Sequence, residues 1–206
     1  MSYGFEARNA SGAVVIDSQF PSMFLGEETS VTGVELYANV YKFSLSQTGY
    51  APFFNVPVGD WVTYSAEFDA GEPAFYGSKS VFSIRKAVFL EEISYTPSGY
   101  GLAVYDSLGN PLFSSSENLI PVVGFTNDLE NKPTEGQFSK SVEWVCPLGS
   151  EWVFGPATPP FNALANQCIK RVTNNSFETT LETILLSTDF PTSGSGGNSV
   201  KAMFAG

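Results

Sequence analysis

The feature that most constrains the fold is a stretch of sequence that occurs twice. A shift of 97 positions carries residues 3–18 onto residues 100–115, and the tyrosine, two glycines, the final serine and four hydrophobic positions then coincide. Each copy contains the spacing Asn/Asp-x-x-Gly, at 9–12 and at 106–109. Asn or Asp can bond its own backbone ahead, and Gly accepts the positive φ that closes a turn. The sequence therefore predicts two similar β-hairpins.

Composition favours strands throughout the chain. The 206 residues are 43% hydrophobic, 15% aromatic and only 15% charged. A chain with this hydrophobic content can bury a core, and its aromatic content suits strands better than helices. We expect an all-β protein, built as an antiparallel β-sandwich.

The repeat indicates where the chain could divide. A strand candidate at 81–95 ends in a Thr-Pro-Ser-Gly turn directly before the second tyrosine, so a boundary is expected near Pro97. This predicts a first β-sandwich module at 1–97, a second at 98–190 and a terminal segment at 191–206. The alternative is one β domain over 1–206.

The terminal segment combines a hinge with a strand. Residues 191–198 are rich in Gly and Ser, which is typical of a flexible linker. The apolar residues 200–204 that follow are expected to reach away and pair with another subunit.

Alternation of hydrophobic and polar residues locates further strands. Residues 29–45 alternate with period 2, but the phase changes near Tyr41, where we expect a β-bulge. Residues 137–146 and 151–154 are predicted to form a hairpin around 147–150. Residues 178–187 could form either a helix or a strand, and the Thr-rich alternation of this segment favours a strand.

Charge and residue usage argue against several functions. The net charge is −11, which opposes binding to nucleic acid or to an anionic membrane. There is no His, the usual general base and zinc ligand. No basic region followed by an apolar core marks a secretory signal, and no apolar run reaches the roughly 20 residues that span a bilayer.

The two cysteines, Cys146 and Cys168, lack metal-ligand spacing, so no metal or cofactor is expected. They could form a disulfide between neighbouring strands, or remain two free buried thiols.

No motif for catalysis stands out. Paired carboxylates such as Glu67 and Asp69 could serve a glycosidase, but an acidic β protein offers several such pairs. A carboxylate-based hydrolase remains a third hypothesis, and we expect no enzyme.

Aromatic residues are the candidates for a binding or interface site. Between residues 47 and 61 several follow one another among Gly and Pro, and they could stack on a carbohydrate, contact a subunit or close the end of a sandwich. The candidates are Tyr50, Phe53, Phe54, Trp61, Trp144 and Trp152.

The repeated hairpin resembles one found in small tail and tail-tip structural (minor tail) proteins of tailed bacteriophages. In them it often stands beside the N-terminal Met and precedes a short apolar strand, as 3–18 and 100–124 do here. The resemblance implies a virion tail protein, assembled in the host cytoplasm, in a symmetric homo-oligomer with other tail proteins. It implies no catalytic residues. A second hypothesis is a receptor-recognition or carbohydrate-binding β-sandwich module that contacts a host glycan or receptor.

Overall fold

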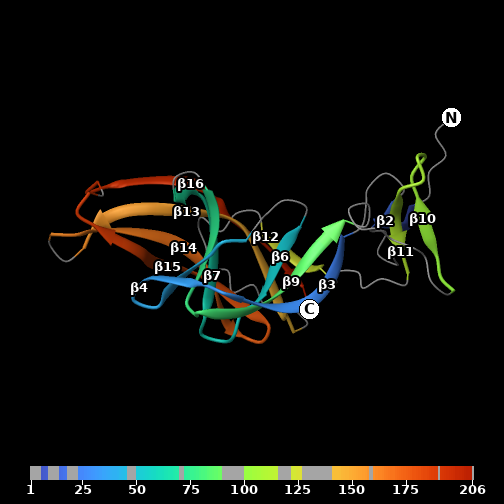
Figure 1. Ribbon diagram of the computed structural model, residues 1–206, viewed down its shortest axis with the longest axis horizontal. Coiled ribbons are helices and arrows are strands. Elements are labelled where there is room, and N and C mark those ends of the chain that lie inside the picture. The colour runs from blue at the N-terminus through green and yellow to red at the C-terminus, as the bar shows by residue number, and fades with distance from the viewer. Residues whose placement is uncertain are drawn as a thin grey trace. The chain divides into compact units, whose positions relative to one another are not determined.

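The computed structural model of the chain is all-β (Figure 1). It describes residues 6–8, 14–17, 23–45, 50–69, 72–89, 100–115, 122–126, 141–157, 160–189 and 191–205. Within these ranges every regular element is a strand, and all strand pairs with a defined register are antiparallel. The prediction of an antiparallel all-β protein is confirmed.

The strands differ widely in length. In chain order they are β1 (Glu6–Arg8), β2 (Val14–Asp17), β3 (Met23–Thr32), β4 (Val34–Tyr37), β5 (Val40–Phe43), β6 (Ala51–Asn55), β7 (Trp61–Asp69), β8 (Glu72–Gly77), β9 (Val81–Phe89), β10 (Ala103–Tyr105), β11 (Pro111–Ser114), β12 (Val122–Thr126), β13 (Trp144–Pro156), β14 (Asn162–Thr173), β15 (Ser176–Ser187) and β16 (Gly194–Ala205).

The chain groups into two compact units that interleave in sequence. Both β1–β2 and β10–β11 belong to unit 1, whereas the sequence analysis assigned one hairpin to each of two successive modules. The predicted boundary at Pro97 lies within 90–99, outside the described residues. Unit 1 comprises Met1–Glu28, Gln47–Pro52 and Arg85–Ile120, and unit 2 comprises Thr29–Ser46, Phe53–Ile84 and Pro121–Gly206.

Two long strands, β13 and β14, change partners along their length. The second half of β13 pairs with the start of β14, in the register Trp152↔Asn166. Earlier in β13, Val145 instead lies opposite Phe54 of β6, and later in β14, Ile169 lies opposite Val62 of β7. The large sheet therefore splits into two arms, β12-β16-β13-β6-β9-β3 and β15-β14-β7-β8-β5-β4.

The main core of unit 2 lies between these arms and is largely phenylalanine. Phe54 of the first arm lies 5.2 Å from Phe75 of the second, and Phe177 lies 5.0 Å from Phe204, both measured between ring centroids. Strands of both arms contribute, so the packing is that of a β-sandwich. The buried members are Phe43, Phe54, Val56, Val62, Phe75, Phe82, Ile84, Val142, Val145, Ile169, Phe177, Ala202 and Phe204.

A second, smaller core covers the opposite face of the second arm. Its members are Val40, Trp61, Ala74, Tyr76, Cys168 and Ile184. They alternate along the strands with main-core residues, as the period of 2 requires. This arm curls far enough that β4 contacts β15 (Figure 1).

The strand predicted at 29–45 is interrupted by a reverse turn. It divides into the end of β3, then β4 and β5, and β4 pairs with β5 in the register Tyr37↔Val40. Ala38 and Asn39 form the two-residue turn, with φ of 32° and 69°. The chain therefore reverses in a hairpin of type I′ geometry, which the sequence did not predict. The register of β4 and β5 also shifts between Glu35 and Tyr37, next to the pair Glu35↔Tyr41, so an irregularity does lie near Tyr41.

Two further expectations are corrected near the C-terminus. Residues 147–150 do not turn the chain back, because β13 runs through them with register shifts beside Gly149. Residues 194–205 form β16, which pairs with β13 and β12 of the same chain. Its residues 202–205 lie between β13 and β12, so this part of the strand already has partners within the chain on both sides.

We predict that Ala38→Gly stabilises the protein. A non-glycine residue in the left-handed region costs about 1–2 kcal/mol. Glycine also gives the unfolded chain more freedom, which lowers the stability by about 0.4–1 kcal/mol. The free energy of unfolding should therefore rise by about 0.5–1 kcal/mol in the variant. Chemical denaturation measures the change. In contrast, Ala165→Gly, at a strand position without positive φ, should lose stability, and a loss in both variants would contradict the explanation.

Candidate assembly surface

The two hairpins of unit 1 pair in the same register. In β1–β2 the partners are Glu6↔Asp17, Ala7↔Ile16 and Arg8↔Val14, with a shift after Ala7. In β10–β11 they are Ala103↔Ser114, Val104↔Phe113 and Tyr105↔Pro111, with a shift after Val104. Every pair, and the shift itself, corresponds under the displacement of 97 positions that aligns the sequences. The prediction of two similar hairpins is confirmed for these strands.

The turn of β10–β11 is held by one carboxylate. Asp106 Oδ1 accepts hydrogen bonds from the backbone N–H groups of Leu108 and Asn110, both at 2.8 Å, and its Oδ2 accepts from Asn110 Nδ2 at 2.7 Å. Gly109 closes the turn at φ 86°. The Asn/Asp-x-x-Gly spacing therefore marks the turn, as expected.

The other end of this hairpin explains why the motif pairs a glycine with a serine. Ser115 Oγ accepts a hydrogen bond from the Leu102 N–H at 2.8 Å, and the Ser115 N–H donates to the Leu102 carbonyl at 2.9 Å. A Cβ on Gly101 would lie 2.7 Å from that hydroxyl oxygen, closer than a real contact allows. Gly101 therefore makes room for the serine that closes the hairpin.

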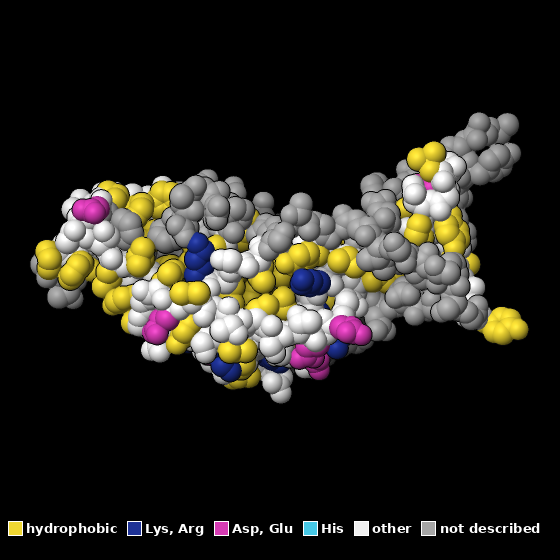
Figure 2. All heavy atoms as spheres, viewed as in Figure 1, with side chains coloured by type: hydrophobic (Ala, Val, Ile, Leu, Met, Phe, Trp, Pro, Cys, Tyr) yellow, Lys and Arg dark blue, Asp and Glu magenta, His cyan; other side chains and the backbone are white. Residues whose placement is uncertain are grey.

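The hairpin has one buried strand and several exposed residues. Leu112, Phe113 and Ser114 of β11 are at most 5% exposed, so both faces of this strand are covered. By contrast, Tyr100 is fully exposed, Leu108 at the turn is 84% exposed, and Leu102 and Tyr105 are exposed by more than 40%. We call these four residues the hairpin surface. Figure 2 shows hydrophobic side chains exposed in this region.

Most of the predicted binding aromatics are structural instead. Phe53 and Phe54 are completely buried, because β6 lies between β9 and β13 and both its faces are covered. Trp61 and Trp144 are also buried. These four rings cannot stack on a ligand.

Tyr50 and Trp152 keep part of their surface exposed. Lys86 Nζ lies 4.6 Å above the Tyr50 ring, a cation–π contact, and partial burial raises the pKa of Tyr50. The Trp152 ring meets Phe154 edge-on, with 5.0 Å between centroids.

Cys146 and Cys168 are free and buried, so the disulfide option is wrong. The pairing of β13 with β14 ends at Trp152↔Asn166, before it reaches either cysteine, so the ladder does not bring the two thiols opposite each other. Burial raises the pKa of Cys146 to about 12 and that of Cys168 well above its usual range. Such thiols are poor nucleophiles.

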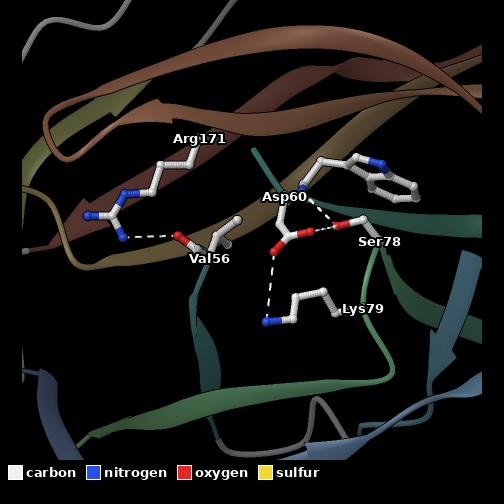
Figure 3. A network of polar contacts seen from close by, with 6 residues as sticks. Val56, Asp60, Ser78, Lys79 and Arg171 are labelled. Atoms are coloured by element: carbon white, nitrogen blue, oxygen red, sulfur yellow. Dashed lines mark hydrogen bonds and ion pairs between the residues drawn. The ribbon is translucent and has the colours of Figure 1, made fainter. Parts of the chain in front are cut away.

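Arg171 is a buried polar residue that no sequence pattern identified. Its Nη1 donates to the Val56 carbonyl at 2.9 Å (Figure 3). Its Nε and Nη2 donate to the carbonyls of Thr173 and Asn174. Burial lowers its pKa. These bonds join the loop after β6 to the turn after β14, so Arg171 is an anchor for the fold.

A second polar network stands beside this loop. Asp60 accepts from Ser78 Oγ at 2.8 Å, and Lys79 Nζ lies 3.9 Å from its other oxygen (Figure 3). Ser78 Oγ in turn accepts from the Trp61 N–H. The described residues include no cluster of His, Cys, Asp and Glu that could hold a metal ion. The side chains of Glu67 and Asp69, the proposed hydrolase pair, lie outside the described residues.

We predict that Gly101→Ala weakens closure of the hairpin, because Ser115 Oγ must move and release the Leu102 N–H. A loss of about 1 kcal/mol corresponds to roughly fivefold faster exchange of the Ser115 amide hydrogen. In a Ser115→Ala background the same substitution should cost much less, and Ser107→Ala should change nothing. An equal cost in both backgrounds would exclude the steric explanation.

The Asp106 carboxyl should titrate below its ordinary pKa of 3.8, first because of the bond from the Asn110 side chain. Since the folded pKa is the lower one, the turn is fully stabilised above about pH 4 and loses this contribution as pH falls through the folded pKa. NMR titration of the Asp106 carboxyl carbon measures this. Asn110→Ala should move the midpoint upward, and an unchanged midpoint would refute the assignment.

Within the described part of the chain no helix is long and apolar enough to cross a membrane. Comparison of the chain with protein-family models, with curated proteins and with solved structures finds no match. Any inference about function therefore depends on the geometry of the two units and on the hairpin motif.

Proposed function

We propose that this chain is a non-enzymatic structural protein of a bacteriophage tail, located at the tail tip, the baseplate or the fibre attachment region. It works through contacts with further copies of itself and with other tail proteins. The observation that carries this proposal is the hairpin surface, which presents four large apolar side chains on a hairpin outside the large sheet.

Exposure of apolar side chains to water on such a hairpin is energetically unfavourable. An isolated two-stranded sheet is marginally stable by itself. The free energy falls when a partner covers exposed apolar side chains. Tyr100 and Leu108 stand fully or almost fully in solvent, while β11 anchors the hairpin through Leu112 and Phe113. An anchored hairpin with exposed apolar residues suits docking onto a neighbouring subunit.

The resemblance to phage tail proteins depends on the hairpin motif, and the two copies of that motif in this chain pair in the same register. The bonds that close β10–β11 involve the same positions that the motif repeats: the glycine after the tyrosine, the Asp of the turn and the final serine. The residues of the motif are therefore the ones that close the hairpin. Buried thiols with raised pKa values also favour a role without covalent chemistry.

The proposal predicts that the protein assembles and that Leu108→Ser weakens the assembly. Size-exclusion chromatography with light scattering of the full chain should show an oligomer whose dissociation constant rises about tenfold or more in the variant, because an apolar anchor is lost. Val58→Ser is the matched control, since Val58 is 55% exposed but lies in unit 2. Mass spectrometry of purified phage particles should detect the chain. A stable monomer that is absent from particles would refute the proposal.

A further inference from the structure

Strand β15 is a long edge strand of unit 2. It runs for 12 residues, and in the part of the chain that the structure describes it forms a ladder with β14 alone. At the other end of the same arm β4 contacts β15, but the two strands form no ladder. With its 4 residues, β4 is too short to flank the whole of β15. Much of the outer edge of β15 therefore has no strand partner among the described residues.

The middle of this strand is its exposed part. Ser176 and Phe177, at the start of β15, are at most 7% exposed. Leu181, in the middle, is 57% exposed, and Thr180 and Glu182 on either side of it are partly exposed. A strand added to this edge would pair the backbone and cover the leucine together.

This edge has few of the devices that keep edge strands unpaired. Natural edges carry Lys or Pro, contain bulges, or are very short. The sequence of β15 contains neither Lys nor Pro, and its ladder with β14 is regular from Phe177 to Thr183. Its two carboxylates already have partners within the chain: Glu178 lies 3.7 Å from Lys170 Nζ, and Glu182 accepts a hydrogen bond from the Thr180 hydroxyl.

The sequence of β15 fits a second copy of itself. Around a two-fold axis perpendicular to the sheet, a residue lies opposite itself or opposite one an even number of positions away. An axis at Thr180 would place Glu178 opposite Glu182, and an axis at Glu182 would place this carboxylate opposite itself. Like charges directly opposite destabilise a strand pair. An axis at Leu181 instead places Glu182 opposite Thr180.

An axis at Leu181 also uses the exposed stretch of the strand best. Towards the turn with β14 the strand becomes buried, and beyond Thr183 its register with β14 shifts. Between these limits Thr179 would lie opposite Thr183, and Leu181 opposite its own copy. Favourable cross-strand pairs such as these contribute roughly 0.2–1 kcal/mol each. The most exposed large apolar residue of β15 thereby becomes the centre of the contact.

We propose that β15 pairs antiparallel with β15 of a second copy of the chain, around a two-fold axis at Leu181. A second copy is the occupant that the strand favours, because this axis joins like threonine and leucine positions and places no charge against a charge. The net charge of −11 opposes association, but at about 0.15 M salt charges more than about 8 Å apart are largely screened. The contact lies in unit 2, so it is separate from the hairpin surface and independent of the function proposed above.

Cross-linking of Leu181→Cys tests this register directly. Residues opposite each other in an antiparallel pair have Cα atoms about 4.5–5.5 Å apart, a distance that a disulfide spans. Under mild oxidation at about 0.15 M salt, the full-length variant should form a covalent dimer about tenfold faster than Val58→Cys, because pairing raises the effective concentration of the two thiols. Val58 is the matched control, since it is 55% exposed in unit 2 and lies outside the strands.

The register and the interface have separate controls. Thr183→Cys should dimerise no faster than Val58→Cys, because its thiol would lie opposite Thr179. The Leu181→Cys dimer should also form in a Leu108→Ser background, so a failure of the hairpin contact is distinguishable from a failure of this one. Cys146 and Cys168 are buried in every variant, and the unsubstituted chain shows any cross-linking through them.

Thermal unfolding of each variant confirms that the fold persists, as expected for substitution of an exposed side chain. Rapid dimerisation of Leu181→Cys alone among the variants supports the proposal. It is overturned if Leu181→Cys and Val58→Cys cross-link at the same rate, or if Thr183→Cys is the fastest. Cross-linking of Leu181→Cys to a different protein in a phage lysate, with no dimer formed by the pure chain, would also overturn self-pairing.

Discussion

The architecture of unit 2 depends on the partner exchange of β13 and β14. Where they pair with each other they form one continuous surface with β15 and β16, and where they separate they begin two arms that enclose the phenylalanine core. Each strand must therefore satisfy two different neighbours on the same edge. A substitution that displaced the register of Trp152 and Asn166 would disturb the spacing of the arms.

Buried polar groups secure the places where strands give way to loops. Arg171 donates to three carbonyl groups on two chain segments, and its burial is tolerated because each nitrogen has an acceptor. Asp106 performs the same task in the hairpin turn with a carboxylate. Asn166 differs from both, because its side-chain oxygen is buried and has no donor.

The hairpin surface in unit 1 is apolar, and large apolar groups on an anchored hairpin favour a protein partner.

The sequence by itself determined the strand content, the two matching hairpins and the turn at Asp106, because periodicity, composition and local hydrogen bonding act over a few residues. It could not show that a reverse turn at Ala38 accompanies the irregularity near Tyr41, since either one changes the phase of alternation. Nor could it tell that Phe54 and Trp61 lie in cores while Trp152 remains partly exposed, or that Cys146 and Cys168 are free thiols. Those outcomes depend on which strands become neighbours and in which register. Only the tertiary structure decides these, because pairing between distant segments is chosen by how well the whole set of side chains packs.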